Sequence, residues 1–115
     1  YDVLLMLAEA KTMQGNVDGA APLVKRIRDR AKLADISMVG WTKDQMMTEI
    51  MHQRNVEFAR EGLHFFDLRR WGTLESVIKT RPAGGYELFT PKFSYYPIPQ
   101  SELNNNPNMT QNAPW

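Results

Sequence analysis

The sequence contains no cysteine, which excludes disulfide bonds and thiolate metal sites. It also lacks any apolar run close to the roughly 20 residues that a membrane-spanning helix needs. Neither sign of charge dominates, because 14 basic residues face 13 acidic ones and leave a net charge of +1. A domain dedicated to nucleic acid usually carries a clear basic excess, so the composition argues against nucleic acid as a partner.

The residues that are present have the composition of a folded protein. The 115 residues are 43% hydrophobic and 23% charged, which is the balance of one modest globular domain. The opening "YDVLLMLAEA" is already helical in pattern, and no initiator methionine, signal peptide or helix cap stands before it. We therefore expect the chain to be the C-terminal part of a larger protein, with any targeting signal or anchor upstream.

Apolar spacing predicts a helical hairpin at the start of the chain. The first helix should cover residues 3–13 and stop at Gly15, since glycine suits the left-handed position after a helix. The second should cover residues 19–33, and Pro22 predicts that its regular hydrogen bonding starts late. A spacing of four, three and four predicts its buried face, at Ala20, Val24, Ile27 and Ala31. Such a hairpin is the unit of tetratricopeptide-like repeats, and one unit alone could not bury its own face.

A capping box marks the start of a third helix. Thr42 and Gln45 have the spacing at which each side chain satisfies the other's free backbone N–H, so we predict a helix over residues 43–61 that ends at Gly62. Trp41, just before the box, could stack on a sugar ring, but a tryptophan there more often staples the helix start. Shorter helices are predicted at residues 65–71 and 74–78.

The composition changes at residue 81. The last 35 residues hold six of the seven prolines and half of the twelve aromatic residues. Pro97 and Pro99 force extended backbone around Ile98, so "YYPIPQSELNNNPNMTQNAPW" cannot be a regular helix. The many aromatic residues predict an ordered strap packed across the helices rather than a floppy tail. We thus expect an all-α fold of tetratricopeptide-like hairpins, with residues 1–80 as the helical part and 81–115 as a long irregular strap of the same domain.

Residues 57–72, "EFAREGLHFFDLRRWG", mix acidic, basic and aromatic side chains. The inner face of the third helix runs through Met47 and Ile50, and the same spacing then reaches two charged residues. Buried charges persist only when they are paired, so we predict an ion-pair network of Arg54, Glu57, Asp67, Arg69 and Arg70. We favour a structural role that fixes one helix against another; the alternative is an anion site, which would need an arginine left unpaired.

Metal and catalytic sites are not expected. Glu49/His52 and Glu61/His64 have the spacing of di-iron bundles, but those sites need the two motifs on separate facing helices. Here the first pair lies on the helix that ends at the second, and Gly62 interrupts the second. The basic run "KRIRDRAK" is interpreted as a solvated helix face, and no serine has a neighbouring histidine that suggests a triad. We predict no cofactor and no enzyme activity.

The segment "REGLHFFDLRRWG" resembles the signature near the C-terminus of the SusD/RagB family, nutrient-binding outer-membrane lipoproteins of Bacteroidetes. Other segments are similar to family motifs too: "YDVLLMLAEAKTMQGN" to a helix ending in "AEA", "VKRIRDRAKL" to the next helix, and "YYPIPQSELNNNPNMTQNAPW" to the terminal segment. The chain departs from the family at Gln53, where glutamate is common, at His64, where arginine is frequent, and at Lys25, where asparagine is frequent. The likeness covers essentially the whole chain.

This resemblance implies a function in binding. It implies a lipid-anchored protein on the extracellular face of the outer membrane, which captures an oligosaccharide, or less often a peptide, without cleaving it. It implies a SusC-like TonB-dependent transporter as the partner over which the protein sits as a lid. The matching residues look architectural, and no ligand-binding residue is assigned; they are Arg54, Glu57, Glu61, Gly62, Asp67, Arg70 and Trp71. A helical-repeat scaffold that binds other proteins is the alternative.

Overall fold

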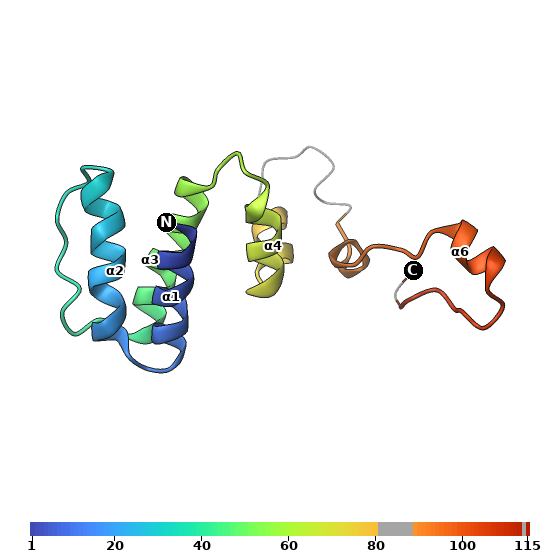
Figure 1. Cartoon of the computed structure of the whole chain (residues 1–115), viewed down its shortest axis with the longest axis horizontal. Helices are drawn as coiled ribbons and strands as arrows, with labels where there is room; N and C mark the ends of the chain where they lie inside the picture. The colour runs from blue at the N-terminus through green and yellow to red at the C-terminus, as the bar shows by residue number, and fades with distance from the viewer. Residues whose placement is uncertain (81–88, 114) are drawn as a thin grey trace. The chain divides into compact units, whose positions relative to one another are not determined.

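The computed structural model describes residues 1–80, 89–113 and 115, and in this part of the chain it contains helices and no strand. The elements, shown in Figure 1, are α1 (Asp2–Met13), α2 (Val17–Arg30), α3 (Lys43–Glu57), α4 (Leu63–Arg70), α5 (Leu74–Lys79), the 3-10 helix η2 (Pro91–Ser94) and α6 (Gln100–Asn105). The expected all-α fold is confirmed. The chain divides into two compact units, Tyr1–His64 and Phe65–Trp115. None of the described helices is long and apolar enough to cross a membrane.

The first two helices form the predicted hairpin. Gly15 has a φ of +83°, the left-handed conformation expected after α1. The late start predicted for α2 is wrong, because regular structure begins at Val17 and Pro22 lies inside the helix. The Asn16 side chain caps this earlier start by accepting from the Gly19 N–H at 2.8 Å. A well-capped first turn thus tolerates the single hydrogen bond that Pro22 removes one turn later.

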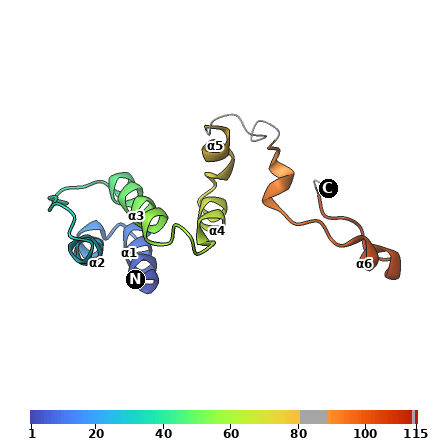
Figure 2. The same cartoon turned by 90° about the horizontal axis from the view of Figure 1, so that it is seen from above.

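The first unit has its own apolar core. The helices α1, α2 and α3 all contact one another and lie side by side in two views (Figures 1 and 2). Three of the four positions predicted for the buried face of α2 are fully buried, whereas Ala31 follows the helix as its exposed C-cap. The fully or nearly fully buried apolar residues of this unit are Leu5, Ala8, Ala20, Val24, Ile27, Met38, Met46, Ile50 and Phe58.

The third helix begins as predicted and ends earlier. Thr42 and Gln45 form the complete capping box, and half-buried Trp41 packs against the core that includes Met46, as a staple would. The helix ends at Glu57 instead of residue 61. The backbone then turns, and Gly62 adopts a φ of +76° just before α4. A glycine is required there because other residues strain at that angle.

The second unit buries few side chains. Among its described residues only Asp67 and Leu68 of α4 and Leu74 of α5 are buried. The two short helices occur close to where the sequence predicts them, with bounds shifted by one or two residues. A turn at Gly72, with a φ of +71°, separates them.

The C-terminal segment is held by side-chain to backbone hydrogen bonds. Residues 96–99, around Pro97 and Pro99, lie outside any helix as predicted, but residues 100–105 form α6, so a regular helix does occur within the quoted segment. The Gln111 side chain accepts from Ile98 N–H at 2.8 Å and donates to Ile98 O at 3.0 Å. The first part of the predicted strap, residues 81–88, and Pro114 lie outside the described residues. The packing of the strap across the helices stays a prediction. The division of the domain between residues 80 and 81 also stays a prediction.

Candidate functional site

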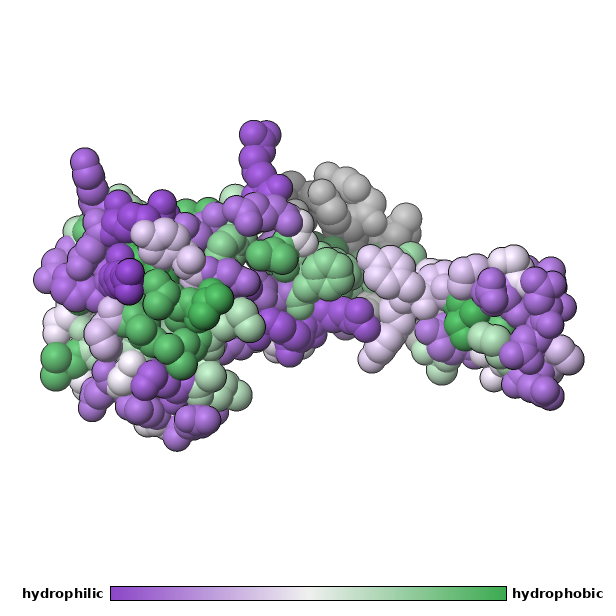
Figure 3. Space-filling model, viewed as in Figure 1, coloured by the Kyte–Doolittle hydropathy of each residue, from purple (hydrophilic) through white to green (hydrophobic). Residues whose placement is uncertain are grey.

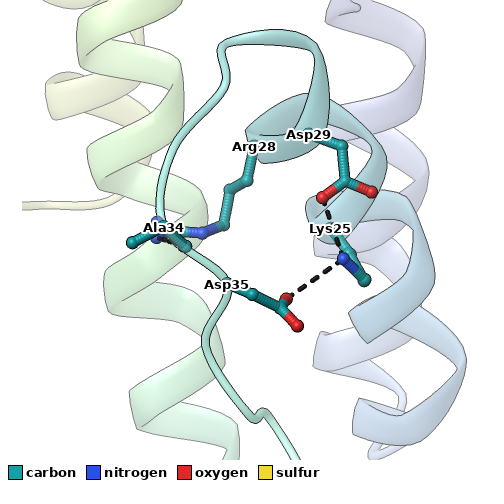
Figure 4. Close-up of polar contacts among 5 residues, drawn as sticks. All are labelled: Lys25, Arg28, Asp29, Ala34 and Asp35. Carbon is teal, nitrogen blue, oxygen red and sulfur yellow. Dashed lines mark hydrogen bonds and ion pairs between the residues drawn. The ribbon is translucent and has the colours of Figure 1, made fainter.

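Lys25 joins α2 to the loop that follows it. Its Nζ donates to Asp29 Oδ1 at 2.8 Å, one turn later on the helix, and to Asp35 Oδ1 at 3.0 Å in the loop (Figure 4). These hydrogen bonds, first the one to Asp29 and then the one to Asp35, outweigh desolvation and raise the pKa of Lys25 above 10.5. Lys25 is therefore protonated at neutral pH and holds residues 31–42 close to α2.

Arg28 fixes the same loop more tightly, because its side chain is only 13% exposed. Its Nη2 donates to the Ala34 carbonyl at 2.9 Å, and its Nη1 donates to Glu49 Oε1 on α3 at 2.6 Å (Figure 4 shows Arg28 and Ala34). Gln53 Nε2 donates to the same carboxylate oxygen at 2.9 Å. One guanidinium therefore ties together α2, the loop and α3 in a partly buried setting, where charge-assisted hydrogen bonds are strong.

The anchored loop and α2 enclose a groove of about 390 Å³. Its apolar lining includes Pro22, Ile36 and Met38, and its charged lining consists of Asp18, Lys25 and Asp35. Because two carboxylates already compensate Lys25, the groove favours a neutral ligand over an anion. An apolar surface with a polar rim can bind a small molecule by burying its hydrophobic side.

A second groove of about 390 Å³ lies where α3 starts. It is lined by Trp41, Asp44, Gln45, Thr48 and Glu49. An indole beside side chains that donate and accept hydrogen bonds is the chemistry that binds a sugar, whose ring stacks on the aromatic face. Trp41 also packs against the core, so the same side chain has a structural role.

Arg54, a buried member of the predicted ion-pair network, is 5% exposed. Its Nη1 donates to Asp2 Oδ1 at 2.8 Å, so it joins the end of α3 to the start of α1. Its guanidinium also lies 5.2 Å from the centre of the Phe58 ring. Sequence spacing carries no signal for this pair, because its two residues lie 52 positions apart.

Glu57, at the end of α3, pairs with a residue at the end of α2. Arg30, at the end of α2, donates to Glu57 Oε2, and the Arg30 guanidinium lies 4.5 Å from the centre of the Tyr1 ring. The Glu57 side chain is 17% exposed. Charged side chains therefore link the C-terminal ends of α2 and α3.

The other three residues of the predicted ion-pair network, Asp67, Arg69 and Arg70, lie on α4. Asp67 is 6% exposed at its side chain and accepts from Arg70 Nε at 2.9 Å. Arg70 also stacks on Trp71, at 4.6 Å from the ring centre, and Arg69 stacks on Tyr95 at 5.1 Å. Each of the five predicted residues thus makes a polar or cation–π contact. That they form one continuous network remains a prediction.

The two Glu-x-x-His pairs do not form a metal site in the part of the chain described here. His52 and Glu61 are exposed, and Glu49 is engaged by Arg28 and Gln53. No group of three or more histidine, aspartate or glutamate residues is close enough to hold a metal ion among residues 1–80, 89–113 and 115.

An organising role for Arg28 is not expected from the sequence, because the basic run around it has the pattern of a solvated helix face. Arg26 and Arg30 in this run are indeed exposed. Arg28 follows buried Ile27 and lies four positions after buried Val24, so it stands at the edge of the apolar face. That position was a usable signal, since a long arginine at such an edge can reach a neighbouring helix.

Comparison of the sequence with protein families identifies the family of this chain. The sequence profile of the SusD family covers residues 2–115. The chain belongs to the SusD family. A crystal structure of a SusD superfamily protein from Bacteroides vulgatus is 42% identical to this SusD-family chain and superposes with a TM-score of 0.91 over 99% of it. That match confirms the tetratricopeptide-like fold.

Curated relatives carry the same family name. Two SusD-like proteins of Formosa agariphila, P2 and P38, are 29% and 30% identical to this SusD-family chain over 98% and 99% of its length. The chain spans 24% and 23% of these relatives, and 26% of the chain in the crystal structure. It thus corresponds to about a quarter of a protein of this family.

Proposed function

We propose that the chain is the C-terminal part of a SusD-like cell-surface receptor. The receptor captures a glycan, or less often a peptide, and delivers it to a SusC-like TonB-dependent transporter for uptake without cleaving it. The match of the SusD family profile to residues 2–115 carries this proposal. In this proposal a lipid anchor upstream of the chain holds the protein on the extracellular face of the outer membrane.

The polar contacts described above support an architectural role for the signature segment. Arg54 and Glu57 use their charges to join helix ends, and Asp67 is paired with Arg70. Groups already engaged in this way are poorly suited to hold a ligand, because binding would have to break existing hydrogen bonds. We therefore propose that residues 1–80 and 81–115 form one domain whose signature residues maintain its shape, while ligand capture occurs at other surfaces.

Co-purification tests the partner directly. The complete protein, tagged at its C-terminus, is captured from gently solubilised outer membranes, and mass spectrometry identifies what accompanies it. A TonB-dependent barrel in near-equal amount is the expected result. Soluble proteins in its place, with the tagged protein in a cytoplasmic fraction, would contradict the proposal and favour a helical-repeat scaffold, which the α1–α2 hairpin also permits.

Capture of a glycan can be tested at Trp41. Native gels containing a panel of soluble plant and host polysaccharides reveal a ligand as a retarded band of the complete protein. If the indole stacks on sugar, Trp41→Ala should remove the retardation and Trp41→Phe should keep much of it. Retardation by a polysaccharide that survives Trp41→Ala, with the fold intact, would assign capture to another surface.

A further inference from the structure

Two exposed surfaces of the first unit differ in their chemistry. Figure 3 shows hydrophobic side chains gathered over α1, where Val3 is 75% exposed and Met6 is 55% exposed. A hydroxylated ligand would lose water on that face without gaining hydrogen bonds. The groove at the start of α3 is lined by four polar residues and by Trp41, which supplies an aromatic surface. Of the two surfaces, the groove is therefore the one that suits a hydrated ligand such as a sugar.

Trp41 is held in place before any ligand binds. Its side chain is half-buried and packs against the core of the first unit. Its backbone N–H donates to the Met38 carbonyl at 3.3 Å. A side chain that is already ordered loses little conformational freedom on binding. The volume of the groove, about 390 Å³, falls within the roughly 300–1,000 Å³ that is common for small-ligand sites.

The polar lining of this groove has free hydrogen-bonding capacity. Gln45 accepts from the Thr42 N–H through Oε1 at 2.8 Å, so its amide nitrogen remains a donor. Thr48 Oγ1 donates to the Asp44 carbonyl at 2.8 Å and can still accept. Within residues 1–80, 89–113 and 115, the Asp44 carboxylate makes no hydrogen bond or ion pair. Because hydroxyl groups donate strongly to an ionised carboxylate, Asp44 is the best acceptor for sugar hydroxyls in this groove.

The lining of the groove carries a negative charge. Asp44 and Glu49 are its two acidic residues, and none of the five lining residues is basic. Arg28 compensates Glu49 at 2.6 Å, which leaves the charge of Asp44. Lys43 is exposed and does not line the groove. A carboxylate or sulfate brought into the groove would therefore meet a like charge.

The start of α3 does not offset this repulsion. Backbone N–H groups at the start of a helix can attract an anion. In α3, however, the capping box engages the N–H groups of Thr42 and Gln45, and Asp44 places its own negative charge in the first turn. A carboxylate in the first turn already complements the helix dipole. An anionic ligand would thus gain little from this helix end.

We propose that the Trp41 groove binds a sugar unit that has no carboxylate or sulfate group, and that Asp44 determines this specificity. The indole stacks on the sugar ring, while the Asp44 carboxylate accepts from its hydroxyl groups and repels an acidic sugar. This inference rests on the proposed capture of a glycan and adds the class of glycan that this groove accepts.

Matched pairs of polysaccharides test the specificity of the complete protein. The pairs are dextran with dextran sulfate, hydroxyethyl cellulose with carboxymethyl cellulose, and amylopectin with carboxymethyl starch, so the members of each pair share a backbone and differ in charge. Isothermal titration calorimetry measures each affinity. We expect a neutral member to bind and its anionic partner to bind at least about tenfold more weakly. Trp41→Ala should abolish binding of the neutral member.

Substitution of Asp44 separates its charge from its shape. Asp44→Asn removes the charge of this exposed side chain and keeps a hydrogen-bond acceptor, so the preference for the neutral member should shrink by about fivefold or more. Asp18→Asn is the matched control, because Asp18 is also an exposed acid in the first turn of a helix but lies outside this groove. It should leave the preference unchanged.

The contrary outcomes distinguish this inference from the proposed function. An anionic member that binds as tightly as its neutral partner, with binding lost in Trp41→Ala, would overturn the specificity and leave glycan capture standing. Binding that survives Trp41→Ala in a folded protein, or a preference that Asp44→Asn does not change, would also overturn the inference alone. Absence of binding to every polysaccharide of the panel would contradict both the inference and the proposed glycan capture.

Discussion

The two units of the chain are ordered by different interactions. Residues 1–64 enclose an apolar core from three helices, with buried leucine, isoleucine, valine and methionine side chains. In residues 65–115, Leu68 and Leu74 are the buried apolar residues of the described part. There the order comes from short helices, cation–π contacts such as that of Arg69 with Tyr95, and side chains that bond to the backbone.

The two units should therefore be sensitive to different kinds of substitution. Burial of apolar surface contributes about 25 cal/mol per Å², so the first unit gains most from its core. A net hydrogen bond contributes about 0.5–1.5 kcal/mol, so a unit held by polar contacts is opened locally by the loss of one or two of them. Truncation of the core should therefore affect global stability, whereas loss of a single side chain in the second unit should affect local opening.

The largest effect is expected in the core of the first unit. Ile50 on α3 is fully buried, and Ile50→Ala should lower the free energy of unfolding by about 2–5 kcal/mol because it leaves a cavity. Urea denaturation followed by circular dichroism measures the change. Val56→Ala on the same helix is the control, since Val56 is 60% exposed and its truncation should cost no more than about 0.5 kcal/mol. Similar losses for both variants would contradict the contrast between core and surface on α3.

An intermediate effect is expected at the one buried charge of α4. Asp67→Ala leaves Arg70 without its 2.9 Å partner, and we expect a loss of about 1–3 kcal/mol. The loss should be smaller than for a fully buried pair because Arg70 is 42% exposed. Thermal melting of the complete protein measures it.

The control for Asp67 is an exposed pair of the same unit. Glu75→Ala breaks the ion pair with Lys79. The side chain of Glu75 is 44% exposed and that of Lys79 is 52% exposed, so the free energy of unfolding should fall by at most about 0.5 kcal/mol. An Asp67→Ala variant with an unchanged melting temperature but lost ligand binding would reverse the architectural interpretation of the signature segment.

Local signals in the sequence are sufficient to predict where the helices lie. The capping box of Thr42 and Gln45 and the glycine after α1 each depend on neighbours within a few positions, and both are confirmed. Gly62 predicts an end for α3 that is too late. The helix in fact ends at Glu57, and a turn fills the positions in between.

Partners far apart in the chain could not be predicted. Arg54 bonds to Asp2 and Arg28 to Glu49, and both contacts depend on how α1, α2 and α3 pack against one another. The buried face of α3 starts one residue earlier than predicted, at Met46 instead of Met47, for the same reason. Met46, Ile50, Gln53 and Arg54 are buried there, whereas the spacing from Met47 predicted a face through Glu57. Apolar spacing predicts which side of a helix is buried only to within about one residue.

Gln111 holds the C-terminal segment of the second unit through the backbone of Ile98. Gln111→Ala removes both hydrogen bonds to the Ile98 backbone, so the Ile98 amide should exchange with solvent about tenfold faster. Hydrogen exchange followed by NMR measures this rate, and the global melting temperature should change little. Gln100→Ala serves as the control, because its bond to Asn104 is exposed. An exchange rate at Ile98 that does not change would mean that other contacts hold this segment.

The smallest effect is expected at Lys25 in the first unit. Lys25→Met removes the cation between Asp29 and Asp35 while it keeps most of the side chain, and it should lower the melting temperature at pH 7 by about a degree. The pKa of Lys25 is raised in the folded state, so its contribution is fully present below the unfolded value of 10.5 and is lost as the pH rises through the higher folded value. The difference between Lys25→Met and the unmodified protein should therefore persist at pH 10 and disappear only at higher pH. A difference that fades between pH 8 and 9 would show that the two carboxylates do not hold the lysine charge in solution.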